Sequence, residues 1–287
     1  MSQPGFNAGL ATRRTVVRVY PPRRERSARV RRRELEITLA TLQKDYAELH
    51  TAVFEAAQVH RRLCAPRLVH YGDFEIANEI FAVRHLPGDF FTVEETNKGM
   101  ILALGDICGK GLAAGMWTTH LVGLVGARVA VSAKPEAIVA GVNRDICLMK
   151  SVVPLSSLFL AKLDQATGNV SYCSAGHPPA MLLRANGDLE FLSEGGLLLG
   201  VAPAASYVAG SFELKVGDVL MIYSDGLIES LNLDGEEFGY ARLEAQLRGS
   251  QAGPADAVLF SVLGAVQDFS AASPLVDDMS LAIVRRT

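Results

Sequence analysis

The residues best suited to chemistry in this sequence are aspartates that stand where an apolar run meets a turn. A single Asp-Gly pair is ordinary turn chemistry, but four such junctions in one chain are harder to explain as turns alone. At each one, a carboxylate can project from the end of a rigid strand, and at three of the four an adjacent glycine lets backbone or ligand approach. The carboxylates are those of Asp89, Asp106, Asp225 and Asp277, and Asp278 directly follows the last of them.

Carboxylates that gather at one point require a cation. Two negative charges about 4 Å apart repel each other by about 4 kcal/mol at an effective dielectric constant near 20. Oxygen ligands without histidine are typical of sites for hard cations rather than for zinc. If the four junctions converge in the fold, the sequence therefore predicts a site for Mg²⁺ or Mn²⁺.

The elements that would position these aspartates are strands that cluster between helices. Runs rich in branched and aromatic residues predict strands over 74–83, 90–94, 100–107, 157–163, 170–174, 180–184, 218–223 and 279–284. Helices are expected over 112–131, 135–150, 240–248 and 254–269. Because strands and helices do not alternate strictly, the order favours an α+β fold of packed antiparallel sheets flanked by helices over a doubly wound parallel sheet.

Residues 1–33 form a basic segment unlike the rest of the chain. The segment holds ten arginines and one acidic residue, whereas the whole chain has a net charge of −3. Almost nothing in it could build a core, which predicts a disordered, solvated arm; an adhesive arm for a polyanion and an organellar transit peptide are the alternatives. The overall charge gives no case for nucleic acid or an anionic membrane as a partner.

The stretch over 34–66 predicts a linker helix with a coiled-coil seam. Apolar positions recur at spacings of four and three from Leu35 to Leu63 without internal glycine or proline, and Pro66 ends the run. We expect a homodimer through the helix over 34–63, although an amphipathic helix lying on its own domain would show nearly the same stripe. Residues 67–287 show no internal repeat and no second boundary, so we expect them to form one domain.

Cysteine usage and hydropathy indicate a cytoplasmic protein. The four cysteines are scattered without a C-x-x-C pair, which argues against a zinc knuckle or a dense disulfide framework. No apolar run approaches the roughly 18 residues that a membrane-spanning helix needs. No apolar segment follows the N-terminal charges, as a signal peptide would require.

The order and spacing of five short motifs resemble a known family. The motifs are P-G-D-F-F, A-L-G-D-I-C-G-K-G, S-A-G-H-P-P-A, S-D-G-L-I-E and D-D-M-S, which begin at residues 87, 103, 174, 224 and 277. Together they resemble the SpoIIE/RsbU-like branch of the metal-dependent protein phosphatases of type 2C, from about Glu55 to the C-terminus. The resemblance implies an αββα sandwich, with two antiparallel sheets between helical layers and two Mn²⁺ or Mg²⁺ ions at one end.

The resemblance also implies roles for particular residues. Asp89 and Asp106 would be metal ligands, with Asp106 as the bridge and the Ile107 carbonyl completing their set. Asp225 and Asp277 would hold the second metal from the other side, and Asp278 occupies the neighbouring acidic position. Members of this branch commonly dephosphorylate phosphoserine or phosphothreonine on anti-sigma-factor antagonists of the STAS class, so we expect a protein phosphatase whose substrate is a regulatory protein of this type.

In this family the attacking group is hydroxide generated between the two metals, so no nucleophilic cysteine or serine is required. Cys108, although close to Asp106, is accordingly interpreted as an ordinary small residue. His177 is expected to order its loop rather than to take part in the chemistry. Lys110 either contacts phosphate or packs within its loop. Ser280 stands where the branch usually has threonine, which keeps the hydroxyl.

Two other functions are weighed against this one. The stretch over 105–111 resembles a phosphate-binding Walker loop, but Leu104 and Gly111 replace the first glycine and the metal-binding hydroxyl of that motif, which disfavours an NTPase. A catalytically silent phosphatase-fold scaffold is the second alternative. A complete carboxylate set argues against it, since a scaffold has no physical reason to keep these charges together.

Overall fold

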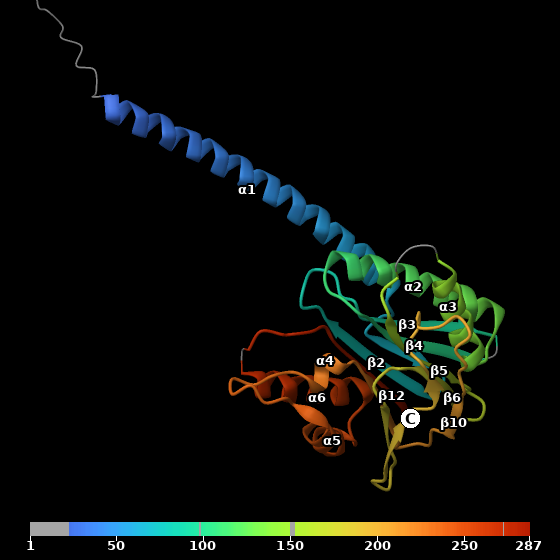
Figure 1. Ribbon diagram of the computed structural model, residues 1–287. Coiled ribbons are helices and arrows are strands. Elements are labelled where there is room, and N and C mark those ends of the chain that lie inside the picture. Colours follow the sequence, from blue (N-terminus) through green and yellow to red (C-terminus); the bar gives the residue numbers. More distant parts are fainter. Residues whose placement is uncertain (1–22, 98, 150–152, 272) are drawn as a thin grey trace, which may run out of the picture. The chain divides into compact units, whose positions relative to one another are not determined.

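The computed structural model describes residues 23–97, 99–149, 153–271 and 273–287. The chain divides into two compact units, Met1–Thr51 and Ala52–Thr287. Figure 1 labels the elements in chain order. None of the described helices is long and apolar enough to cross a membrane.

The first described element is one long helix, α1 (Arg23–Leu63). It begins inside the basic segment expected over 1–33, so residues 23–33 are helical, while 1–22 lie outside the described residues. An uninterrupted stretch without glycine or proline extends the helix as readily upstream of Glu34 as downstream of it. The apolar seam of this helix is exposed over its N-terminal part, at Leu35, Leu39, Leu42, Tyr46 and Leu49.

The second unit contains two sheets whose strands pair antiparallel, apart from one short parallel strand. The first sheet has the order β1 (Leu68–Tyr71), β2 (Phe74–Phe81), β12 (Met279–Arg286), β11 (Val219–Tyr223), β7 (Ala180–Leu183) and β8 (Leu189–Leu192). The second has the order β10 (Gly210–Glu213), β6 (Asn169–Ala175), β5 (Ser156–Leu163), β4 (Gly99–Ile107) and β3 (Phe90–Thr96), with β9 (Gly195–Gly196) parallel to β6.

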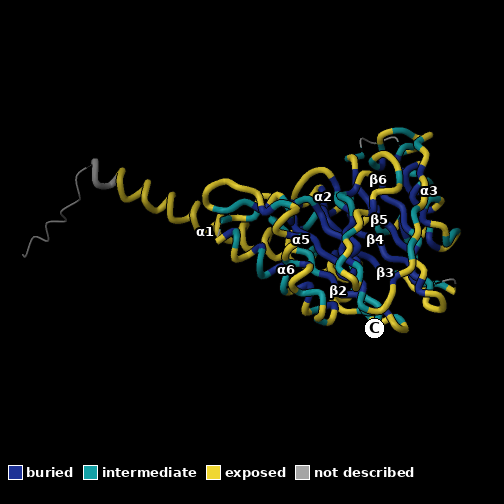
Figure 2. The backbone as a smooth tube through the Cα atoms, turned by 90° about the horizontal axis from the view of Figure 1, so that it is seen from below, coloured by how far each residue is buried: buried dark blue, intermediate teal, exposed yellow. Residues whose placement is uncertain are grey.

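Helices cover the outer face of each sheet (Figures 1 and 2). Helices α2 (Leu112–Val131) and α3 (Pro135–Leu148) pack on the second sheet, and α5 (Gly239–Ser250) and α6 (Ala255–Ser270) pack on the first. The short helix α4 (Asp225–Ile228) follows β11. The expected α+β fold, an αββα sandwich preceded by a long helix, is confirmed.

The core has three apolar layers because the buried strands present alternate residues to opposite faces. On β4, Leu102 and Leu104 point into the layer between the sheets, whereas Ile101 and Ala103 point toward α2 and α3. Asp106 continues the series of Leu102 and Leu104, which directs its side chain into the space between the sheets at the end of the strand. The apolar period therefore places a carboxylate at one end of the sandwich.

Candidate metal centre

Strand pairing brings the aspartates of both sheets to the same end of the sandwich. Phe90 pairs with Gly105 across β3 and β4, so Asp89, directly before β3, lies beside Asp106. In the other sheet, β11 and β12 pair from Tyr223 and Leu281 onward. Asp225 therefore follows the end of β11 next to the point where Asp277 leads into β12.

The electrostatics of Asp89 and Asp106 indicate that these acids form one cluster. Burial raises the pKa of Asp106 to about 6, and the charges of Asp225, Asp277 and Asp278 contribute to the rise. Asp89 is 1% exposed. Burial, followed by the charge of Asp106, raises the pKa of Asp89 well above its usual value. Both carboxylates thus lie in an environment that favours a nearby positive charge.

Two serines hold Asp89 to the opposite sheet. The Ser280 hydroxyl donates to Oδ2 of Asp89. The Ser280 amide donates to the Ser224 hydroxyl over 2.9 Å, and the Ser224 amide donates to the Ser280 carbonyl over 3.0 Å. The ends of β11 and β12 are therefore joined to each other and, through one hydroxyl, to the start of β3.

Asp278 binds the backbone of the loop between β2 and β3 through both of its carboxylate oxygens. The side chain is 5% exposed. Its Oδ1 accepts from the Val83 amide at 2.7 Å and its Oδ2 from the Gly88 amide at 2.6 Å. The two hydrogen bonds fix the loop that leads into Asp89, because Asp278 accepts from an amide at each end of the segment 83–88. Its expected role as a metal ligand stays a prediction.

Glycine allows the loops around the cluster to approach one another closely. A Cβ on Gly226 would lie 2.0 Å from the Asp278 carbonyl oxygen, so the turn after Asp225 and the loop before β12 contact each other through backbone. A Cβ on Gly88 would lie 3.1 Å from the Ile107 carbonyl oxygen. That oxygen thus faces the loop before Asp89.

Lys110 neutralises Asp277 in the described structure. Its Nζ lies 2.7 Å from Oδ2 of Asp277, with side chains 35% and 40% exposed. The same ammonium donates to the Val276 carbonyl at 2.5 Å. Lys110 therefore contacts the loop before β12 rather than its own loop, and a contact with phosphate stays a prediction.

The thiol of Cys108 is exposed. Partial burial and the charges of Asp106 and Asp225 raise its pKa. A thiol with a raised pKa is largely protonated and therefore a poor nucleophile at neutral pH. The environment of Cys108 thus agrees with its interpretation as an ordinary small residue.

His177 is buried between the sheets, on the connection from β6 to β7. Its Nδ1 lies 2.7 Å from the Ser157 hydroxyl. Its amide donates to the Ser174 hydroxyl at 3.2 Å. These contacts support a role in ordering the loop.

Sequence reasoning missed Ser157 and Ser224, although Ser224 could have been found because it directly precedes Asp225 in the S-D-G motif.

The donors fit a hard cation, although they do not form a closed cage. Within the described ranges, no three acidic, histidine or cysteine side chains are drawn together tightly enough to hold a metal ion by themselves. Asp277 turns to Lys110 and Asp278 turns to backbone amides. The remaining chemistry nevertheless matches Mg²⁺ or Mn²⁺, because all donors are oxygens and the buried acids carry raised pKa values.

Known proteins resemble this chain in both sequence and fold. The phosphoserine phosphatase RsbU of Bacillus subtilis (strain 168) is 22% identical over 249 residues, which are 86% of this chain and 73% of RsbU. The SiaA-PP2C domain of Pseudomonas aeruginosa superimposes with a TM-score of 0.73 at 15% identity and covers 84% of this chain and 98% of that chain. The RsbU and RsbW domains of Rv1364c from Mycobacterium tuberculosis give a TM-score of 0.65 at 22% identity, with 77% and 62% covered.

The solved structures show that the two-sheet sandwich is the PP2C fold. The sequence family follows from a separate comparison. The family model of stage II sporulation protein E (SpoIIE) matches residues 96–287, which is well over half of the chain. The matched region includes four of the five expected motifs and the acids on β4, α4 and the loop before β12. The chain therefore belongs to the SpoIIE family.

Proposed function

We propose that this protein is a metal-dependent protein phosphatase that hydrolyses phosphoserine or phosphothreonine on a regulatory protein. The observation that carries the proposal is the convergence of acids from both sheets at one end of the sandwich. The family supports the same reaction, since its relative RsbU is named a phosphoserine phosphatase. The four cysteines are free, which accords with a reaction in the cytoplasm.

The residues of the cluster divide into metal ligands and residues that hold them. The ligands would be Asp89, Asp106, the Ile107 carbonyl, Asp225 and Asp277, around two Mn²⁺ or Mg²⁺ ions that supply an activated water and neutralise phosphate oxygens. Ser280 holds Asp89 through its hydroxyl. Asp278 holds the loop before Asp89. Metal-bound water as the attacking group would need no cysteine or serine nucleophile, so the proposed reaction involves no phosphoenzyme.

The substrate we propose is a phosphorylated STAS-type antagonist of an anti-sigma factor. Two lines support a regulatory partner. The motifs resemble the branch that acts on such proteins, and the Mycobacterium tuberculosis relative combines RsbU and RsbW domains. A protein substrate also accords with the site, whose proposed ligands Asp106 and Asp225 are only partly buried and open at the end of the sandwich.

Hydrolysis of para-nitrophenyl phosphate by the full chain tests the reaction directly. We expect turnover that requires Mn²⁺ or Mg²⁺ and that a chelator abolishes. A phosphoserine peptide should be hydrolysed under the same conditions. Binding of the phosphopeptide without turnover in Mn²⁺ would support the scaffold alternative, and metal-dependent hydrolysis of ATP in place of phosphoester would support the NTPase.

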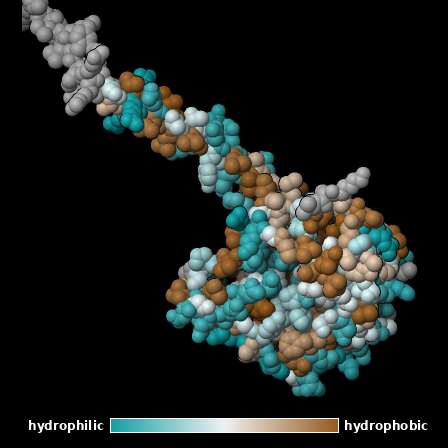
Figure 3. All heavy atoms as spheres, viewed as in Figure 1, coloured by the Kyte–Doolittle hydropathy of each residue, from teal (hydrophilic) through white to brown (hydrophobic). Residues whose placement is uncertain are grey.

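We also propose a homodimer formed through α1. The exposed seam runs from Leu35 to Leu49, and Figure 3 shows hydrophobic residues along this helix. Tyr46 is 68% exposed and Leu42 is 60% exposed, which is costly for side chains of this size in water. A second copy presents the same pattern of fours and threes, so two seams can interdigitate as knobs into holes. Nearer the C-terminal end of α1, the seam residue His60 is buried, so there the seam packs within the unit Ala52–Thr287 instead of being available to a second copy.

Charge reversal in the seam tests the dimer. Leu42→Glu with Leu49→Glu would place like charges in the seam and should convert a dimer into monomers, measured by light scattering. The matched control is Ala40→Glu with Ala47→Glu, which adds the same charges to the same helix outside the seam and should leave the dimer intact. A wild-type chain that is monomeric at micromolar concentration would refute the proposal.

A further inference from the structure

A buried pair of polar side chains lies next to Asp106, the proposed bridging ligand, and neither residue of the pair is among the proposed metal ligands. It consists of Ser157 on β5 and His177 on the β6–β7 connection, with the Ser157 hydroxyl 2.7 Å from Nδ1 of the imidazole. Ser157 is 8% exposed and His177 is 5% exposed. Nε2 of His177 has no hydrogen-bond partner among the described residues. A buried, partly satisfied polar pair destabilises a core relative to apolar side chains, so its presence calls for a reason.

The strand register places this couple beside Asp106. Asp106 and Ser157 are direct partners across β4 and β5. Side chains of directly opposed residues in an antiparallel pair lie on the same face, with Cβ atoms about 4.5–5.5 Å apart. The face is the one between the two sheets, because Leu104 and Phe159, two residues away on each strand, belong to the layer between them. Ser157 therefore forms the wall next to the Asp106 carboxylate.

His177 fixes the Ser157 hydroxyl from behind. The β6–β7 connection that carries His177 is held by two internal hydrogen bonds. The His177 amide donates to the Ser174 hydroxyl at 3.2 Å, and the Ser174 hydroxyl donates to the His177 carbonyl at 3.4 Å. Burial lowers the pKa of His177 to about 3, so the imidazole is neutral at physiological pH. A neutral imidazole can donate or accept at Nδ1, and either role restricts the rotation of the serine hydroxyl.

We propose that Ser157 and His177 act together as positioning residues for Asp106. The imidazole holds the serine hydroxyl, and the serine keeps the carboxylate in the orientation in which it binds metal. This inference rests on the proposed function, because it gives Asp106 the role of a ligand. It assigns His177 an effect on the metal site that extends beyond the order of its own loop, in the manner of residues that orient metal ligands from behind.

Mn²⁺ affinity and thermal stability of the full chain separate this role from a structural one. Ser157→Ala and His177→Gln should each weaken Mn²⁺ binding by about tenfold or more, measured by titration calorimetry. The matched control is Ser270→Ala, a serine that is also 8% exposed but lies on α6. The control should bind Mn²⁺ as the wild type does, whatever its effect on the melting temperature.

The double variant tests whether the two residues act as one unit. Ser157→Ala with His177→Gln should bind Mn²⁺ no more weakly than the weaker single variant, because the imidazole acts only through the serine. Multiplied losses would overturn the coupling. Lower melting temperatures with unchanged Mn²⁺ affinity would overturn the positioning role, and Ser157→Ala alone decides this if His177→Gln does not fold. Unchanged Mn²⁺ binding by Asp106→Asn would instead overturn the proposed function, and the inference with it.

Discussion

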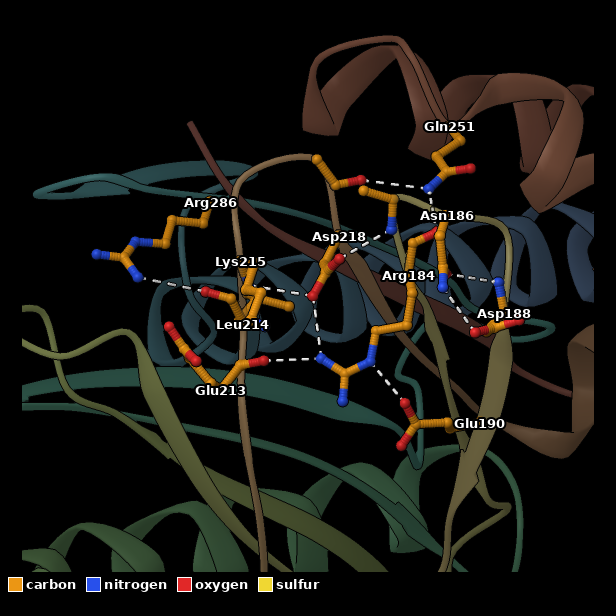
Figure 4. Close-up of polar contacts among 12 residues, drawn as sticks. Arg184, Asn186, Asp188, Glu190, Glu213, Leu214, Lys215, Asp218, Gln251 and Arg286 are labelled. Carbon is orange, nitrogen blue, oxygen red and sulfur yellow. Dashed lines mark hydrogen bonds and ion pairs between the residues drawn. The ribbon is translucent and has the colours of Figure 1, made fainter.

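Two buried aspartates, Asp218 before strand β11 and Asp89 beside the other end of that strand, have opposite surroundings. Asp218 directly precedes the strand and is 2% exposed. Its Oδ1 accepts from the Ala185 amide at 2.9 Å, and its Oδ2 accepts from Arg184 at 3.0 Å and from the Lys215 amide at 3.1 Å. Figure 4 shows this network, in which Arg184 also contacts Glu190 and the Glu213 carbonyl. Here one arginine and backbone amides compensate the negative charge.

Asp89 and Asp106, beside the other end of β11, lack such compensation. Asp89 is 1% exposed, and the hydrogen bond it receives from Ser280 comes from a hydroxyl rather than from a cation. Its neighbour is another acid, Asp106, whose charge raises the pKa of Asp89 further. Asp218 and Asp89 are thus equally buried but differ in whether a cation or backbone amides compensate their charge. A compensated acid joins strands together, whereas uncompensated acids in a cluster are typical of a functional site.

Removing one acid at the uncompensated end should have the largest effect on activity. Asp106→Asn deletes the proposed bridging ligand, and loss of several kcal/mol of transition-state stabilisation corresponds to at least a hundredfold lower turnover of para-nitrophenyl phosphate. The metal-free fold should be retained or stabilised, because a repelling charge is gone. Circular dichroism and calorimetry check the fold. Turnover like that of the wild type would refute the dinuclear assignment.

Removing the compensated acid should instead affect stability. Asp218→Ala leaves Arg184 and two backbone amides without their acceptor, which we expect to lower the free energy of unfolding by about 3 kcal/mol. Denaturant titration measures the change. Asp188→Ala, an exposed acid of the neighbouring hairpin, is the control and should cost far less. Activity per folded molecule should not change, and a selective loss of turnover by Asp218→Ala would contradict the comparison.

The pH dependence of stability should sharpen the contrast, because His177 at the uncompensated end is a base buried in neutral form. Its pKa is lowered to about 3 by burial, so between pH 6.5 and 3 the unfolded chain binds one more proton than the folded chain at this site. This residue therefore makes stability fall as the pH drops through that window, by at most about 1.4 kcal/mol per pH unit. Unfolding of metal-free His177→Gln should show a shallower dependence. An identical slope in both proteins would argue against a neutral buried imidazole.

The smallest effect is expected at Lys110, which supplies part of the missing compensation. Its ion pair with Asp277 is partly exposed, so the ammonium competes with a metal for that carboxylate by about 1 kcal/mol or less. Lys110→Met should therefore tighten Mn²⁺ binding by up to about fivefold in calorimetry, whereas Lys134→Met should not. Weaker Mn²⁺ binding by Lys110→Met would show that the lysine assists the site.

The secondary structure was largely predictable because most elements carry a strong local pattern. The central strands, such as β4 and β5, are continuous apolar runs, and α2 and α3 are long helical stretches. The edge strands β1, β8 and β10 were missed, since each has four residues with alternating or exposed positions. Their pairing depends on a neighbouring strand rather than on their own composition.

The sequence by itself determined where the candidate acids stand, because aspartates at strand ends are visible in a linear pattern. Only the tertiary structure decided what each acid contacts. Asp278 holds Val83 across 195 residues of chain, and Lys110 reaches Val276 across 166. Strand register likewise set Ser157 opposite Asp106. Contacts over such separations arise from how the sheets pack and pair, so no spacing between residues in the sequence encodes them.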